Sequence, residues 1–133
     1  MPDEPNAIDP NAIKIQRADD YRLIYANNVV SDATAWDVRL TFGQFDKLTD
    51  GALVNIQQLS VTITYELAKY MMFWLELQVI AHEIEMGRRV GLRPSVIPNE
   101  VPPVAEEDKN NPNIVKLHDE MTKLRAKLMA SLE

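Results

Sequence analysis

The stretch LVNIQQLSVTITYELAKYMMFWLELQVIAHEIEM, residues 53–86, decides the fold. From Leu53 to Ile63 apolar and polar residues alternate, which is typical of a strand with one buried face. The alternation changes phase near Gln57-Gln58, and a β-bulge there returns both apolar sets to the same face. From Tyr65 to Met86 the period becomes helical, and Gly87 is placed to end the helix. The stretch therefore predicts a strand that runs directly into a long helix.

Two further strands precede this stretch. Residues Trp36 to Phe42 alternate strictly between apolar and polar side chains, and Gly43 is expected to end this strand. Residues Arg22 to Val30 are rich in β-branched and aromatic side chains, and a polar turn at Ser31–Thr34 follows. Short polar connections between successive strands favour antiparallel pairing. We predict an α+β fold, an antiparallel three-stranded meander backed by the 65–86 helix.

The remaining chain divides by composition. Residues 1–20 carry three prolines and twice contain Pro-Asn-Ala-Ile, which predicts a flexible N-terminal arm ahead of a β-β-β-α domain at residues 21–92. Residues 93–112 form a proline-rich linker with a preference for extended conformations. Residues 113–133 are predicted to form a C-terminal amphipathic helix. Its apolar seam recurs at spacings of three and four and comprises Ile114, Leu117, Met121, Leu124 and Leu128.

Bulk properties exclude several function classes. The 133-residue chain has a net charge of −6, which argues against nucleic acid or an anionic membrane as its partner. Cysteine is absent, which excludes disulfides, thiolate catalysis and cysteine-based zinc sites. The most apolar stretch, Tyr70 to Ala81, contains Glu76 and is shorter than the roughly 20 residues of a membrane span. The amino terminus shows no apolar signal segment, so a cytoplasmic location is expected.

The central helix is more apolar than its predicted place in the fold requires. Its polar residues form a narrow stripe through Lys69, Glu76 and Glu83. A helix that lies on a sheet buries an arc only a little over 100° wide. Leaving four further large apolar side chains in water forfeits about 1.5–3 kcal/mol each, which is comparable with the whole stability of a domain. A second surface is therefore expected to cover the helix.

Three occupants fit this requirement: the same helix of a twofold partner, the chain's own C-terminal seam, and a client polypeptide. A homodimer or higher homo-oligomer is the expected solution, because closed symmetry is the commonest form of soluble assembly. The predicted interface comprises Tyr70, Met71, Phe73, Trp74, Leu77, Ile80 and Ile84 of the central helix, with Leu117, Met121, Leu124 and Leu128 of the C-terminal helix. We predict a non-enzymatic assembly or adaptor protein that binds itself and a protein partner.

Candidate chemistry is sparse. His82 and Glu85 lie three residues apart, a spacing used by carboxylate-bridged metal sites. Such a site needs further ligands, which His118, Asp119 and Glu120 are placed to supply; otherwise His82 and Glu85 belong to the solvated end of the helix. The sequence contains no nucleophile elbow, Ser-His-Asp pattern or phosphate-cradling loop. No enzyme activity and no cofactor are therefore predicted.

Several motifs resemble a bacterial family catalogued as domain of unknown function 3467. The motifs are Tyr25-Ala26-Asn27-Asn28-Val29, Trp36 to Gln44, and Val61-Thr62-Ile63-Thr64 leading to Ala68-Lys69. The resemblance covers roughly residues 21–84, and the phrase from Arg39 to Gly43 is its most specific part. The chain departs from the family's pattern at Trp36, Val38 and Thr64-Tyr65. The resemblance implies the β-β-β-α arrangement and carries no established activity.

The layout of the whole chain is also similar to that of SecB-type export chaperones. Antiparallel strands, a long helix, a proline-bearing linker and a final helix follow one another in an acidic chain. The likeness implies an alternative function, in which apolar grooves beside the central helix bind extended or unfolded polypeptide. Fold analogy alone does not establish that function.

Overall fold

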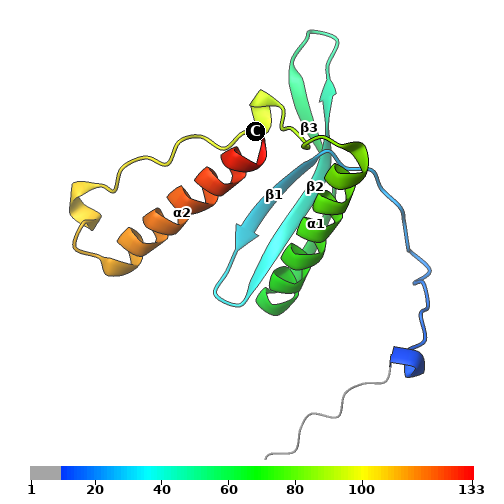
Figure 1. Cartoon of the computed structure of the whole chain (residues 1–133). Helices are drawn as coiled ribbons and strands as arrows, with labels where there is room; N and C mark the ends of the chain where they lie inside the picture. Colours follow the sequence, from blue (N-terminus) through cyan, green and yellow to red (C-terminus); the bar gives the residue numbers. More distant parts are fainter. Residues whose placement is uncertain (1–9) are drawn as a thin grey trace, which may run out of the picture. The chain divides into compact units, whose positions relative to one another are not determined.

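A computed structural model describes residues 10–133 of the chain (Figure 1). It shows an α+β fold with a three-stranded antiparallel sheet and two α-helices, as the sequence predicts. The chain falls into two compact units, one ending at Tyr65 and the other running from Glu66 to Glu133. The predicted 21–92 domain extends over both units. Residues 1–9 of the predicted N-terminal arm, including the first Pro-Asn-Ala-Ile phrase, lie outside the described residues.

The first unit is built around the sheet. A short 3-10 helix, η1 (Pro10–Ala12), precedes strands β1 (Asn28–Ala33), β2 (Asp37–Lys47) and β3 (Leu53–Thr64). The strand order is β1-β2-β3 and both pairings are antiparallel, which confirms the predicted meander. The turn between β2 and β3 places Gly51 at a φ of 85°, a conformation that glycine adopts without steric cost.

The predicted β-bulge is confirmed. Phe42 lies opposite Leu59 and the next residue, Gly43, lies opposite Gln57, so Gln58 is the extra residue of β3. Opposite residues of an antiparallel pair share a face. Because Ile56 lies opposite Gln44, two positions along β2 from Phe42, the apolar residues on both sides of the bulge share one face. On the other face, the Thr41 and Ser60 hydroxyls hydrogen-bond at 2.8 Å.

The prediction that Gly43 ends the second strand is wrong. β2 continues to Lys47, and Gly43 lies inside it, opposite the bulge. A Cβ atom at position 43 would lie 2.6 Å from both the Ile56 carbonyl oxygen and the Asn55 side-chain oxygen. Glycine is required here because the bulged backbone approaches closely, and a close approach gives the same sequence signal as a strand end.

The predicted position of the first strand is also wrong. β1 begins at Asn28 rather than Arg22, and the expected turn residues Ser31, Asp32 and Ala33 belong to the strand. The chain reverses instead at Thr34, whose hydroxyl oxygen accepts hydrogen bonds from the Trp36 and Asp37 backbone amides, each at 3.1 Å. This side-chain turn fixes the hairpin register and draws polar residues into the strand.

One backbone and two side-chain hydrogen bonds hold the segment that precedes β1 against β2. The Asn27 backbone amide donates to the Gly43 carbonyl at 3.1 Å, and the Asn27 side-chain oxygen accepts from the Phe45 backbone amide at 2.9 Å. Gln44 Nε2 donates to the Tyr25 carbonyl at 2.9 Å. The backbone pairing therefore ends with the Asn27 amide, and side-chain hydrogen bonds hold the preceding residues against β2.

The second unit contains most of α1 (Tyr65–Met86), a linker with 3-10 turns η2 (Pro94–Val96) and η3 (Glu106–Asp108), and α2 (Pro112–Ser131). α1 has the predicted bounds, and Gly87 follows it at a φ of 66°, the left-handed conformation of a helix C-terminus. The Asn111 side chain caps α2 by accepting hydrogen bonds from the Asn113 and Ile114 amides. Neither described helix is long and apolar enough to cross a membrane.

Little of the apolar surface of the described residues is buried. Among residues 10–133, Ile63 of β3 is the one apolar side chain that is buried, and it lies opposite Val38 of β2. Its neighbours on the same face, Val38, Leu40 and Phe42, are half-buried. The core of the sheet therefore lies near the start of β2, and many large apolar side chains are exposed.

Candidate interaction surface

α1 exposes the predicted interface residues. None of its 22 residues is buried. Of the seven predicted interface positions on this helix, Tyr70, Phe73, Trp74, Leu77, Ile80 and Ile84 are exposed and Met71 is half-buried. Phe73 is 61% exposed and Ile84 is 77% exposed.

Three aromatic side chains form a cluster on the exposed part of α1. The ring of Trp74 contacts Tyr70 at a centroid distance of 6.0 Å and Phe73 at 5.3 Å, both in edge-to-face orientation. Aromatic residues carry a large share of the binding energy at protein interfaces, because they present a wide rigid surface with few rotatable bonds. The cluster is therefore the strongest candidate anchor on the helix.

The polar stripe divides the apolar surface of α1 into two faces. At 100° per residue, Phe73, Leu77 and Ile80 lie on one side of Glu76, and Leu75 and Val79 lie on the other. We call the first the Phe73 face (Tyr70, Phe73, Leu77, Ile80 and Ile84) and the second the Val79 face (Met72, Leu75, Val79 and Met86). A single amphipathic helix has one such face.

The α2 seam is also exposed. Leu117 and Leu124 are each 61% exposed, Met121 is exposed and Leu128 is half-buried. The half-buried positions of α2 instead lie mainly one residue further along the chain, at Val115, His118, Arg125, Met129 and Leu132. The face beside the seam is thus covered within the unit, and most of the seam is not.

The linker covers part of this face of α2. Arg125 Nε donates to the carbonyl oxygens of Pro98 and Asn99, each at 3.1 Å, and the His118 ring lies 2.9 Å from the Pro102 carbonyl oxygen. Neither contact was predicted from the sequence, in which His118 was considered only as a further metal ligand. A signal was available, because His118 and Arg125 are seven residues apart, two helical turns, and so share a face.

An apolar groove lies between α1 and α2. It has a volume of about 440 Å³ and is lined by Leu75, Val79 and Ile80 of α1 and by Leu124 and Leu128 of α2. Glu76 and Lys127 form an ion pair at 3.6 Å on its rim. The groove therefore combines Leu75 and Val79 of the Val79 face and Ile80 of the Phe73 face with part of the α2 seam.

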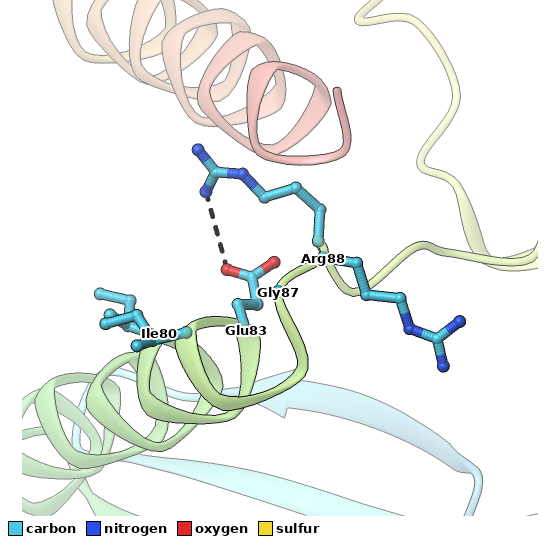
Figure 2. Close-up of a pocket in the computed structure, with 6 residues that line it drawn as sticks. Ile80, Glu83, Gly87 and Arg88 are labelled. Carbon is cyan, nitrogen blue, oxygen red and sulfur yellow. Dashed lines mark ion pairs between the residues drawn. The ribbon is translucent and has the colours of Figure 1, made fainter.

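A smaller hollow of about 370 Å³ lies at the carboxyl end of α1, lined by Ile80, Glu83 and Gly87 among others (Figure 2). The Glu83 carboxylate lies 3.6 Å from the Arg89 guanidinium and accepts a 2.7 Å hydrogen bond from the Val90 amide. Its side chain is only 13% exposed. The sequence predicted Glu83 as part of a polar stripe at the solvated end of the helix, whereas in the structure it binds the residues that follow the helix.

The described residues do not assemble the metal site considered for His82 and Glu85. No group of three or more histidine, aspartate or glutamate side chains in residues 10–133 is placed to hold an ion. His118, a proposed further ligand, is occupied by the Pro102 carbonyl and lies 3.9 Å from Asp119. His82 and Glu85 therefore gain no further ligands from the described part of their own chain.

No family model matches this chain, and no curated protein or solved structure is significantly similar to it. The resemblances to domain of unknown function 3467 and to SecB-type chaperones therefore rest on motifs and layout alone. The exposed surfaces of α1 and α2 carry the functional argument.

Proposed function

We propose that this chain is a non-enzymatic assembly or adaptor protein, which associates with itself through the Phe73 face of α1 and binds a protein partner. The observation that carries the proposal is the absence of any buried residue from a 22-residue helix rich in large apolar side chains. Fully burying a Leu, Ile or Phe side chain stabilises by about 1.5–3 kcal/mol. Because Phe73, Ile80 and Ile84 are exposed, much of this stabilisation is gained only when a partner buries them.

A second copy of the same helix suits the Phe73 face. A twofold interface brings one patch against itself, so an apolar patch without charged residues in its middle is self-complementary. The charged stripe of Lys69, Glu76 and Glu83 lies to one side of this face, where it forms a polar rim. The α2 seam adds exposed apolar surface in the same unit, because the linker occupies the neighbouring face of α2.

The test is the absolute mass in solution by light scattering of the full chain and of two matched variants. Phe73→Glu places a charge in the proposed interface. Gln78→Glu adds the same charge about 140° around α1, at 100° per residue. The proposal expects at least twice the 15.2 kDa chain mass for the wild type and for Gln78→Glu, and a halved mass for Phe73→Glu. A wild-type chain of 15.2 kDa at all concentrations would refute it.

A second candidate function is binding of extended polypeptide in the groove between α1 and α2. The groove favours it, because large apolar side chains of both helices line it among charged residues, and its volume of about 440 Å³ accommodates side chains of a bound segment. This function requires the groove to be open in the native assembly. Val79→Glu should then abolish suppression of aggregation of a model client without changing the assembly mass, whereas a wild-type protein that neither binds a hydrophobic dye nor protects a client excludes it.

A further inference from the structure

The two edges of the sheet differ in length and charge. β1 has six residues and carries Asp32, whereas β3 has 12 residues and contains neither a charged residue nor a proline. The charged residues are concentrated on the central strand β2, at Asp37, Arg39, Asp46 and Lys47. Edge strands normally carry charges or prolines, because an unprotected edge offers free backbone groups to another chain. β3 has only its bulge as protection.

We propose that β3 pairs antiparallel with β3 of a second copy of this chain, about a twofold axis at Val61, and joins two sheets into one of six strands. Among residues 10–133 no strand pairs with β3 on the side away from β2. Strand addition at a sheet edge gains main-chain hydrogen bonds, and side chains on alternate positions decide which strand is accepted. The residues of β3 favour pairing with the same strand of a second copy.

The bulge selects the register. Gln58 divides β3, and the regular part runs from Leu59 to Thr64. An axis at Val61 places Leu59 opposite Ile63 of the second copy, so apolar side chains meet on one face. It also places Ser60 opposite Thr62 of the second copy, so hydroxyls meet on the other face. Thr and Ser hydroxyls are favourable cross-strand partners, as the Thr41–Ser60 hydrogen bond inside the sheet illustrates.

Neighbouring registers fit less well. An axis at Ser60 brings Gln57 and Gln58 into the pairing, so the bulge interrupts the ladder. An axis at Thr62 places Leu59 opposite Tyr65 of the second copy, which is already the first residue of α1. The axis at Val61 uses the regular part of β3 without either interruption.

Charge favours a second copy over an unrelated strand. Pairing about a twofold axis sets identical segments against each other, so any charge near the axis meets a like charge from the second copy. β3 avoids this repulsion in every register, because all 12 residues are uncharged. β1 carries Asp32, so registers that bring Asp32 near the axis would set two like charges against each other.

The edge contact rests on the proposed self-association. Five or six paired residues bury less than the roughly 1,000 Å² that a specific stable interface needs. α1 begins at Tyr65, directly after β3, so the same pair of chains is available for contacts through the Phe73 face. The pairing of β3 then sets the register of an assembly to which α1 contributes much of the buried apolar area.

A single cysteine tests the axis. The chain contains no cysteine, so Val61→Cys introduces the only thiol. Opposite Cα atoms in an antiparallel pair lie about 4.5–5.5 Å apart, within the range that a disulfide spans. Mild oxidation should convert most of the Val61→Cys protein into a covalent dimer on a non-reducing gel. Asp32→Cys, on the other edge strand, should remain largely monomeric on the gel.

Paired charges test the register independently. Ser60→Lys/Thr62→Lys sets lysines against lysines across the axis, whereas Ser60→Lys/Thr62→Glu sets each lysine against a glutamate. Both variants lose the Thr41–Ser60 hydrogen bond, so each controls for the other's effect on folding. The first should raise the dissociation constant at least tenfold relative to the second, measured by light scattering over a dilution series.

The outcomes separate this inference from the proposed function. If Val61→Cys forms no covalent dimer and both charge variants dissociate equally, while Phe73→Glu still halves the mass, the edge pairing is refuted and assembly through α1 stands. If the wild-type chain is monomeric, both proposals fail. A covalent dimer through Val61→Cys, together with selective loss of the lysine-only assembly, establishes the pairing.

Discussion

The two α-helices have similar lengths, 22 and 20 residues, and their surfaces are covered differently. Along one face of α2, His118 and Arg125 bind carbonyl groups of the linker, and Val115 and Met129 on the same face are also half-buried. In α1, Glu83 is the one charged side chain that is half-buried, and it binds the residues directly after the helix. The large apolar side chains of the Phe73 face stay exposed.

The difference lies in the polar groups that accompany the apolar ones. α2 presents His118 and Arg125, whose directional hydrogen bonds hold a specific segment of backbone against the helix. On the Phe73 face the one polar group is the Tyr70 hydroxyl, and the described residues show no hydrogen bond from it to the linker. Directional polar groups hold a helix face against its own chain, whereas a large exposed apolar face is typical of a surface that binds another molecule.

The largest expected effect comes from Trp74→Glu, which removes the centre of the α1 aromatic cluster. We expect dissociation to the monomer and a loss of about 2–4 kcal/mol of association free energy, the range of an interface hot spot. The melting temperature should also stop rising with protein concentration, because only an assembly gains stability from concentration. Light scattering and thermal unfolding at two concentrations measure these effects.

The matched substitution for Trp74→Glu is Ala130→Glu on α2, at an exposed position away from the seam and the linker. It should leave the mass unchanged. Equal dissociation of the two variants would mean that added charge alone disrupts the assembly. The proposed difference between α1 and α2 would then be refuted.

Arg125→Ala should release the linker without changing the mass. The substitution removes the donor that holds the Pro98 and Asn99 carbonyls. Hydrogen bonds from charged groups contribute about 1.5–3 kcal/mol, so amides between Val96 and Val104 should exchange with deuterium roughly tenfold faster or more. Lys123→Ala, two residues away and exposed, should leave these rates unchanged. Unaltered exchange in Arg125→Ala would show that apolar contacts hold the linker.

Glu83 offers a smaller test at the end of α1. Glu83→Ala removes both the acceptor for the Val90 amide and the partner of Arg89, and should cost about 1 kcal/mol of local stability. Glu83→Gln keeps an acceptor oxygen and should cost less. Hydrogen exchange at Val90 reports the difference. Identical effects of both variants would assign the stability to the charge rather than to the hydrogen bond.

The sequence predicted those features that depend on periodicity. The change of phase in β3 located the bulge at Gln58, because a period of two leaves no other way to keep Val54 and Val61 on one face. The bounds of α1 followed from its apolar run and from Gly87. Both features are encoded within one element and need no knowledge of its neighbours.

Features that depend on contacts between side chains and distant backbone were missed. Thr34 moved the hairpin turn, and Asn27 ended the β1 ladder, through hydrogen bonds that periodicity does not register. Arg125 and its linker carbonyls are 26 and 27 residues apart. For the interaction surface, the sequence identified the apolar residues of α1 and its polar stripe, whereas the groove beside α2 was found only in the structure.

The smallest expected effect is that of Lys127→Ala, which removes the ion pair with Glu76 on the rim of the groove. The two side chains are 73% and 59% exposed and 3.6 Å apart, so water screens their attraction. Such pairs contribute about 0–1 kcal/mol, and the melting temperature should change by no more than a few degrees. Glu76→Ala should have an equally small effect. If either variant lowers the melting temperature more than Arg125→Ala does, the Glu76–Lys127 pair holds α1 specifically against α2. The Phe73 face would then be assigned to packing within the subunit rather than to assembly.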